Sequence, residues 1–534
     1  MPATPSAATS AAKIMAAILG SRILGLAREQ ILSAVFGASR ELDALKVAFR
    51  IPNILRDLFA EGALSSAFVP TFAKLLTAEG RAAAFRLANL VFNALVVILS
   101  VLCLLGILFS DQLVHLIAPD FAASSGKLAL TVTLTQIMFP FILFVALAAL
   151  YMGLLNSLGS FGLPAAASMA FNAGSIVSGA GLAWWLDPSF ADKEKCICGF
   201  AIGVLLGGLM QWLVQVPRAR RLGFRHTLTL DWRDAGLQKI GRLMAPAVLG
   251  VSAVQINFLV MTRFAASFGD GAVTWLDNAF RLMQLPIGLF GVAISMVTLP
   301  AVSRSVARHD LGEFKRRIQA GLRYMLFLAV PATAGLWLLA GPIVSALFQW
   351  GAYSAADTAR TAGLLQYYTI GLLGYAAVKV LAPTFYSLNK PLTPTLVSIG
   401  GIVLNLALIW LAVGVLHWGL FSLPLAISLV AILNAAQLCL RLQQHIGGII
   451  DRAFTGSVVK ILTATLLMSA VVWLLNRWCR DWLPDGKWAV VAQAIILCGL
   501  GAAVYFGAAW LFKLEEVRRV QRALTARWFK PRRP

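Results

Sequence analysis

Four arginines that lie inside long apolar segments are the residues of this chain most suited to chemistry. An arginine at the centre of a membrane helix costs roughly 2.5 to 3.5 kcal/mol, so it must pair with an acid, reach a headgroup or line a water-filled cavity. Its guanidinium group keeps its charge and donates parallel hydrogen bonds that match phosphate oxygens. We therefore predict that four side chains bind an anionic substrate in a central cavity, with structural ion pairs as the alternative: Arg22, Arg28, Arg56 and Arg281.

Other charges accompany these arginines. Arg50, Asp57 and Glu61 fall at i, i+7 and i+11, close to one stripe of a helix, which makes Arg50 the best candidate for a structural ion pair. Lys379 is a further base inside an apolar segment. Its side chain could reach towards a lipid headgroup or line a cavity, and the sequence favours neither interpretation.

The first apolar segment needs a bend if both of its arginines are to serve one site. Arg22 and Arg28 point about 120 degrees apart on a straight helix, and Gly25 lies between them. We therefore expect a break near Gly25. Glu29 follows Arg22 by seven residues and is a second possible acidic partner.

The composition is that of a polytopic membrane protein. Of the 534 residues, 59% are hydrophobic and 13% are charged, about half the charged fraction of an ordinary soluble domain. Apolar segments of roughly 20 residues, the length that spans a bilayer, recur about fourteen times. The first of them is interrupted by Arg22 and Arg28 and lacks a cleavage site, so we expect it to remain as a helix.

The basic residues that give the chain its formal net charge of +22 are unevenly distributed along the sequence. Basic residues gather in alternate connections between the apolar segments and in the C-terminal tail, whereas the intervening connections hold few. This asymmetry predicts that both termini are cytoplasmic. Since topology accounts for the basic connections, nucleic acid is not expected as a partner. The largest basic connection contains Arg218, Arg220, Arg221, Arg225, Arg233, Lys239 and Arg242.

A weak internal repeat divides the chain. The stretch AFRIPNILRDLF from Ala48 resembles AFRLMQLPIGLF from Ala279, 231 residues later, and SLGSFGLP aligns with SLNKPLTP at an offset of 230. Two matches at nearly one offset predict two halves of six helices with the same orientation, related by a pseudo-twofold along the membrane normal. Transporters with this design bind substrate between the halves and expose it to alternate sides.

The expected fold is therefore an all-α polytopic membrane protein with two six-helix lobes and two additional C-terminal helices. We place the N-lobe at residues 1–230, the C-lobe at 231–445, and the last two helices with a basic tail at 446–534. The repeat leaves the last two helices without a counterpart.

No cofactor or metal site is predicted. The five histidines stand in or near connections without ligand partners, and the one close cysteine pair, Cys196 and Cys198, has no second pair beside it. A membrane-embedded enzyme would need placed acids, bases or metal ligands, so an enzyme is a weaker interpretation than a transporter.

Several motifs closely resemble the MurJ (MviN) family of lipid II flippases, which belongs to the multidrug/oligosaccharidyl-lipid/polysaccharide (MOP) exporter superfamily. The resemblance extends through nearly all of residues 13–512, and the block FAEGALSSAFVP is its most specific part. It implies two six-helix lobes around a cationic cavity. The motifs that carry it are SRILGLARE from Ser21, LDALKVAFRIPNILRDLFAEGALSSAFVP from Leu42, RLMQLPIGLFGVA from Arg281 and VKVLAP from Val378.

The resemblance also assigns residues. It implies that Arg22, Arg28, Arg56 and Arg281 receive the diphosphate of lipid II, and that the last two helices form a groove for its polyprenyl tail. Phe280 and Gln284 stand beside Arg281 where some members have acids, so acid-mediated gating is not carried over, and sodium is not predicted. Asp43, Glu61 and Lys379 also fall on positions important in the family. With the charges noted from spacing added, cavity or gating roles are expected for Glu29, Asp43, Arg50, Asp57, Glu61 and Lys379.

We therefore expect a lipid II flippase that works by alternating access and makes or breaks no bond. Its partners would be lipid II and the bilayer, and a monomer is favoured. The nearest alternative is a MOP-superfamily exporter of another polyprenyl-linked glycan. A membrane-embedded enzyme that acts on polyprenyl phosphates is a weaker one. Drug exporters generally use acidic residues for cations, which disfavours them for so basic a set of side chains.

Overall fold

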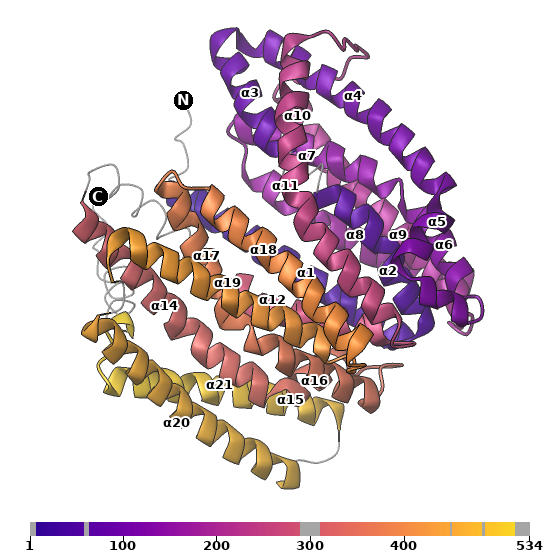
Figure 1. The fold of residues 1–534 in the computed structure, drawn as a ribbon. Helices are drawn as coiled ribbons and strands as arrows, with labels where there is room; N and C mark the ends of the chain where they lie inside the picture. The colour runs from indigo at the N-terminus through magenta and orange to yellow at the C-terminus, as the bar shows by residue number, and fades with distance from the viewer. Residues whose placement is uncertain (1–6, 58–63, 289–309, 449–450, 483–485, 518–534) are drawn as a thin grey trace, which may run out of the picture. The chain divides into compact units, whose positions relative to one another are not determined.

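The computed structural model describes residues 7–57, 64–288, 310–448, 451–482 and 486–517, and the ordered elements in these ranges are helices (Figure 1). By length and composition, eight of the described helical segments can cross a membrane, or nine if α16 (Ala355–Ile370) and α17 (Leu372–Ser387), bent by 41°, form one span. The prediction of an all-helical polytopic membrane protein is confirmed. Glu61 lies outside the described residues.

Residues 1–274 form one compact unit, called unit 1 here. Its α8–α9 pair packs closely because small residues face each other: a Cβ on Gly199 would lie 2.6 Å from the backbone nitrogen of Ala183. Its elements are α1 (Ala7–Phe36), α2 (Arg40–Arg56), α3 (Ser65–Ala78), α4 (Gly80–Leu108), α5 (Ser110–Ile117), η2 (Pro119–Ala123), α6 (Lys127–Met138), α7 (Phe141–Ser157), α8 (Gly162–Leu186), α9 (Lys193–Leu213), α10 (Val216–Arg221) and α11 (Ala235–Ala266).

Residues 275–534 form unit 2. Helices α20 and α21 pack together and on α14 through a buried apolar cluster, in which the Tyr505 hydroxyl donates to the Phe327 carbonyl at 2.6 Å (Figure 1). Besides α16 and α17, the elements are α12 (Ala272–Pro286), which begins in unit 1, and α14 (Leu311–Leu338), α15 (Ala340–Phe348), α18 (Leu392–Ile409), η4 (Trp410–Val415), α19 (Ser422–Ile446), α20 (Arg452–Trp482) and α21 (Lys487–Leu511).

Serine or aspartate occupies the N-cap position of several of these helices. Each accepts a hydrogen bond from a backbone amide of the first turn, which would otherwise lack a helical partner. At α16 the arrangement is a complete capping box between Ser354 and Asp357. The other capping side chains are Ser39 for α2, Asp192 for α9, Asp234 for α11 and Asp310 for α14.

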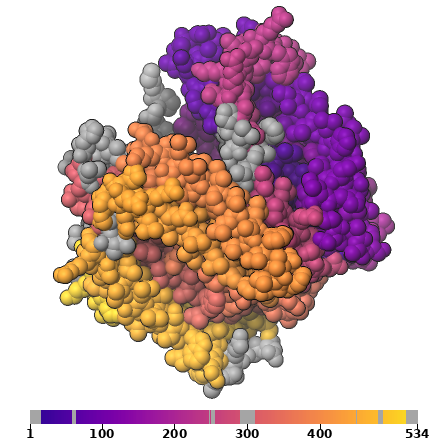
Figure 2. All heavy atoms as spheres, in the orientation of Figure 1, coloured from indigo at the N-terminus to yellow at the C-terminus, as the bar shows by residue number. Residues whose placement is uncertain are grey.

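Apolar side chains cover the outer face of many helices. On α18 the residues Leu392, Leu396, Ile399 and Val403 follow helical spacing and are 46% to 72% exposed. The helix belongs to the orange surface in Figure 2. A helical stripe of this kind is suited to contact with lipid rather than water.

Helix α1 is continuous from Ala7 to Phe36, so the expected break near Gly25 is wrong. The glycine serves packing instead. A Cβ at Gly25 would lie 3.7 Å from the side-chain amide of Asn172 on α8, and that amide donates to the Ser21 carbonyl at 3.1 Å. The small residue lets α8 approach and bond the backbone of α1.

The compact units divide after Thr274, because α11 packs on α3 and other helices of unit 1. The Gln255 amide of α11 donates to the Asp57 carboxylate at 2.9 Å, close to the end of α2. This contact-based division differs from lobe boundaries drawn at residues 230 and 445. The three-part organisation from the internal repeat stays a prediction.

Candidate functional site

A buried charged cluster joins α1 and α2 in unit 1. The Arg28 guanidinium donates to Glu29 at 3.1 Å, and the Lys46 ammonium lies 3.4 Å from the other oxygen of the same carboxylate. Arg28 also lies over the Phe171 ring, 5.2 Å from its centre. The Glu29 carboxylate thus contacts two basic side chains, and the face of the Phe171 ring holds the Arg28 guanidinium in place.

Arg56 lies at the end of α2 and binds the carboxylate that follows it. Two of its nitrogens donate to one oxygen of Asp57, at 3.0 and 2.7 Å, while Gln255 donates to the other. The Arg50 guanidinium lies 5.9 Å from the centre of the Phe258 ring. The structure thus brings Asp57 to Arg56, although the stripe in the sequence pointed to Arg50.

The remaining predicted site residues lie apart from this cluster in the chain. Arg22 is an exposed residue of α1. Arg281 belongs to α12 in unit 2 and pairs with Asp277, one turn earlier, at 3.3 Å. Lys379 is exposed on α17.

Asp43 has a defined structural task. Its fully buried carboxylate accepts from the Gly271 amide at 2.7 Å, from the Thr274 amide at 2.9 Å and from the Thr274 hydroxyl at 2.7 Å. These donors belong to the first turn of α12 and the residue before it. A carboxylate at a helix N-terminus satisfies the orphan amides and complements the helix dipole, so Asp43 fixes where α12 begins.

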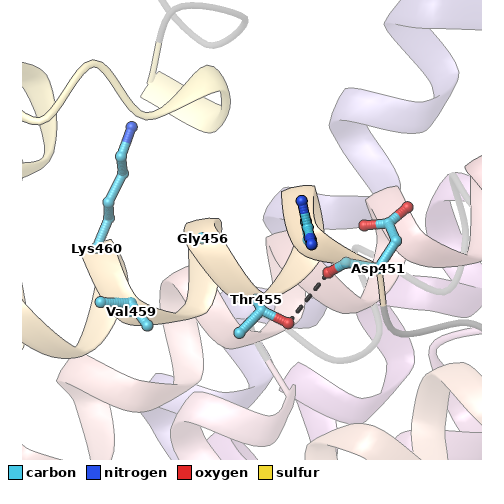
Figure 3. Close-up of a pocket in the computed structure, with 6 residues that line it drawn as sticks. Asp451, Thr455, Gly456, Val459 and Lys460 are labelled. Atoms are coloured by element: carbon cyan, nitrogen blue, oxygen red, sulfur yellow. Dashed lines mark hydrogen bonds between the residues drawn. The ribbon is translucent and has the colours of Figure 1, made fainter.

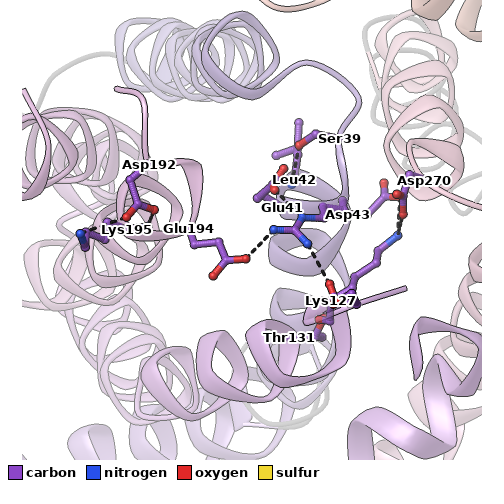
Figure 4. A network of polar contacts seen from close by, with 12 residues as sticks. Ser39, Glu41, Leu42, Asp43, Lys127, Thr131, Asp192, Glu194, Lys195 and Asp270 are labelled. Atoms are coloured by element: carbon purple, nitrogen blue, oxygen red, sulfur yellow. Dashed lines mark hydrogen bonds and ion pairs between the residues drawn. The ribbon is translucent and has the colours of Figure 1, made fainter. Parts of the chain in front are cut away.

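Lys127 completes this arrangement and was not anticipated (Figure 4). Its ammonium group is 1% exposed and lies 3.2 Å from Asp43 and 2.7 Å from Asp270. It also stands 3.9 Å from the centre of the Phe121 ring. The only signal in the sequence is an isolated lysine directly after Gly126, which has a left-handed backbone, and this is too weak to identify a partner 84 residues away.

A more exposed network surrounds the same end of α2 (Figure 4). Arg40 pairs with Glu41 at 2.7 Å and with Glu194 at 2.6 Å, and it also donates to the Ser125 carbonyl at 2.8 Å. In the connection before α9, hydrogen bonds from the Lys195 amide and side chain lower the pKa of the Asp192 carboxyl. These contacts tie three connections of unit 1 together.

A pocket of about 750 Å³ lies at the start of α20 (Figure 3). Asp451, which precedes the helix, accepts from the Phe454 amide at 2.7 Å and from Gln319 on α14 at 2.9 Å. The pocket is lined by Asp451, Arg452, Thr455, Gly456, Val459 and Lys460. Within the described ranges, no group of three or more His, Cys, Asp or Glu side chains could hold a metal ion.

Comparison with known proteins gives one consistent family. A family model described as "Lipid II flippase MurJ" matches residues 32–492. The lipid II flippase MurJ of Burkholderia cenocepacia is 34% identical over 93% of this chain and 96% of its own length. A probable lipid II flippase MurJ of Vibrio cholerae is also 34% identical, over 92% of this chain and 93% of its own.

Solved structures agree with the sequences. A structure titled as lipid II flippase MurJ in an inward closed conformation superposes with a TM-score of 0.77 at 25% identity, covering 93% of this chain and 98% of that one. An inward-facing multidrug transporter of the MATE family and MOP superfamily gives a TM-score of 0.66 at 16% identity, covering 80% of this chain and 95% of that one. The second likeness shows a shared fold.

Proposed function

We propose that this chain, which belongs to the lipid II flippase family MurJ, carries undecaprenyl-diphosphate-linked disaccharide-pentapeptide from the cytoplasmic to the periplasmic leaflet by alternating access. The family consists of transporters, so no covalent step is involved. The observation that carries the proposal is the buried cluster of Arg28, Glu29 and Lys46, which places two basic side chains at largely buried positions of α1 and α2. Basic side chains inside a membrane protein are costly and are retained where they serve a function, and their charge suits an anionic headgroup.

The arginines are held in ways that suit a diphosphate. Arg28 is oriented by Phe171 and Glu29, Arg56 by Asp57, and Arg281 by Asp277. A preoriented guanidinium loses less side-chain freedom when it binds, and it replaces the water around a phosphate with charge-assisted hydrogen bonds. We assign the diphosphate to the side chains predicted from the sequence: Arg22, Arg28, Arg56 and Arg281.

The other charged residues would assist in different ways. Glu29 and Asp57 orient arginines, whereas Asp43 would act in gating because it holds the start of the helix that carries Arg281. Arg50, Glu61 and Lys379 remain proposed cavity or gating residues, Arg50 from its spacing to the nearby acids and the other two from the sequence resemblance.

We further infer the topology from the internal repeat and the distribution of basic residues. It comprises fourteen spans in two six-helix lobes related by a pseudo-twofold, residues 1–230 and 231–445, followed by two more helices and a basic tail in 446–534. Both termini are then cytoplasmic, in a bacterial inner membrane. The exposed apolar faces of α20 and α21 suit them to guide a polyprenyl tail. We favour a monomer.

The decisive experiment is depletion of the protein in its native bacterium, followed by an externally added enzyme that degrades lipid II. Depletion is expected to leave lipid II protected inside the cell, and re-expression is expected to make it accessible. Arg28→Ala should fail to restore access although it is inserted at a normal level. Arg317→Ala is the matched control, because this exposed arginine of α14 pairs with Glu313 at 2.6 Å and has no proposed substrate role.

Two results would contradict the proposal. If lipid II stayed equally accessible after depletion, the chain would not be the flippase in that cell. If Arg28→Ala restored access as well as Arg317→Ala does, the buried cluster would not bind the substrate. Transport of another polyprenyl-linked glycan is tested separately, by competition for binding to the purified protein. Preference for that glycan over lipid II would favour the alternative.

A further inference from the structure

The connection between α10 and α11, residues 222–234, is fixed to the side of α4 by two asparagines. Asn89 donates to the Arg225 carbonyl at 3.1 Å and accepts from the Thr227 amide at 3.1 Å. One turn further along α4, Asn93 donates to the carbonyls of Thr227 and Thr229, at 2.8 and 2.7 Å. An irregular segment held through its own backbone in this way has a fixed course, so its side chains face defined directions.

Aromatic contacts hold the beginning of the same connection. Phe224 is buried, with its ring 5.6 Å from Phe85 and 5.7 Å from Tyr151. The His226 ring lies 4.3 Å from that of Phe92, and its Nε2 is 3.0 Å from the Asn93 side-chain oxygen. The anchoring therefore uses Phe224, His226 and the backbone.

The large apolar side chains that follow take no part in this anchoring. Leu228 is 90% exposed, Trp232 is 48% exposed and Leu230 is 42% exposed. Single exposed leucines are ordinary, but three large apolar residues within five positions of a fixed segment mark an interaction surface. This apolar group needs a partner that covers it.

The depth of the connection along α4 indicates what that partner is. The exposed apolar stripe of α4 runs through Val97, Val101 and Leu104 to Leu108. Counting back roughly 20 residues from Leu108, the length of a bilayer-spanning helix, reaches the turn that begins at Asn89. The two asparagines, and the connection that they hold, therefore lie where acyl chains meet headgroups. Tryptophan and leucine are favoured at this level.

The charged residues around the connection indicate that its partner is anionic. Exposed basic side chains before, within and after the connection far outnumber its two acids, Asp231 and Asp234, and Asp234 is occupied as the cap of α11. Clustered arginines beside inserted apolar residues attract anionic headgroups. The exposed bases are Arg218, Arg220, Arg221, Arg225, Arg233, Lys239 and Arg242.

We propose that residues 222–234 form an interfacial anchor that inserts Leu228, Leu230 and Trp232 into the headgroup layer of a bilayer leaflet containing anionic phospholipid, with the neighbouring arginines bound to the lipid phosphates. The anchor does not depend on the identity of the transported substrate. It fixes the chain between α10 and α11 to the membrane surface.

Site-directed spin labelling of the full-length protein in nanodiscs tests this anchor. In a background with the native cysteines replaced, a nitroxide is placed at residue 228 or 230, and the control nitroxide at Lys195, an exposed residue at the opposite end of α9. The bilayers contain phosphatidylcholine with or without phosphatidylglycerol. With phosphatidylglycerol present, the labels at 228 and 230 are expected to collide more with oxygen than with a water-soluble nickel chelate, whereas the label at 195 shows the reverse.

A second measurement separates the charge from the apolar insertion. The triple variant Arg221→Gln, Arg225→Gln, Arg233→Gln should retain several-fold less phosphatidylglycerol in native mass spectrometry than Arg317→Gln, a single exposed change on α14. If the nitroxides at 228 and 230 have an aqueous signature in both bilayers, the surface belongs to a protein partner or to water and the proposal is wrong. Equal lipid retention by the two variants would also overturn it.

Discussion

Replacing Lys127 by methionine tests how the start of α12 is held. The change keeps the length of the side chain but removes an ammonium group that lies 3.2 Å from Asp43 and 2.7 Å from Asp270. Breaking a buried ion pair costs about 3 to 5 kcal/mol when the remaining charge has no compensation. Asp43 keeps three hydrogen bonds from Gly271 and Thr274, so we expect a smaller loss, about 2 to 3 kcal/mol, similar to one charge-assisted hydrogen bond.

The expected loss can be measured as a change in Tm. For a folded unit of this size, each kcal/mol lowers Tm by roughly 2 to 4 °C, so Lys127→Met should lower it by about 4 to 12 °C. The assay is thermal unfolding of the purified protein in detergent, followed by size-exclusion chromatography. Lys195→Met is the control, because Lys195 is 65% exposed and pairs with Asp192 at 3.0 Å. An exposed pair contributes about 0 to 1 kcal/mol.

Comparing the two lysine variants shows whether the buried ion pair of Lys127 stabilises the protein. If Lys127→Met lowers Tm no more than Lys195→Met does, the buried ion pair does not stabilise unit 1 and the stabilising role of Lys127 beside the Asp43 cap is refuted. Combining Lys127→Met with Asp43→Asn adds a second check. The double variant should lose less than the two single variants together, since both changes remove the same interaction.

Three further predictions concern packing and energetics. Gly199→Val should destabilise the α8–α9 pair by about 1 to 3 kcal/mol, seen as a lower Tm, because its Cβ would lie 2.6 Å from the Ala183 nitrogen; an unchanged Tm would contradict the close approach. Tyr505→Phe should cost about 0.5 to 1.5 kcal/mol in the same assay, since it leaves the Phe327 carbonyl without its donor, and no change would show that water replaces the hydroxyl. Moving one negative charge outward across 100 mV releases about 2.3 kcal/mol, so collapsing the membrane potential should slow exposure of lipid II, and an unchanged rate would reject this driving force.

Sequence reasoning identified the class of protein because that information is repetitive. Long apolar segments recur, and a lipid-spanning helix must satisfy its own backbone, so composition alone predicts an all-helical membrane protein. Residue types were equally informative for Arg28 and Glu29, since charges in such segments are costly and must have partners. What the sequence could not supply was the choice of partner.

The acidic partners show why that choice was out of reach. Spacing by seven places two residues on one helical face but about 10 Å apart along the axis, which is far for an ion pair. In the structure Asp57 binds its neighbour Arg56 and Gln255 of a distant helix, and Glu29 binds Arg28 and Lys46. Gly25 was interpreted as a hinge because a glycine that bends a helix and one that admits a neighbouring side chain have the same sequence signature.

Helix α12 runs without interruption from Ala272 to Pro286, with the capped turn at one end and Arg281 two turns further on. The seven residue steps from Thr274 to Arg281 measure about 10 Å along the helix axis. Arg281 and the turn capped by Asp43 therefore belong to one continuous helix and move together. If Arg281 binds the substrate phosphate as proposed, the continuous helix would transmit a displacement of Arg281 to Thr274 and its hydrogen bonds with Asp43. Substrate binding and release of the helix N-terminus from Asp43 would then be coupled.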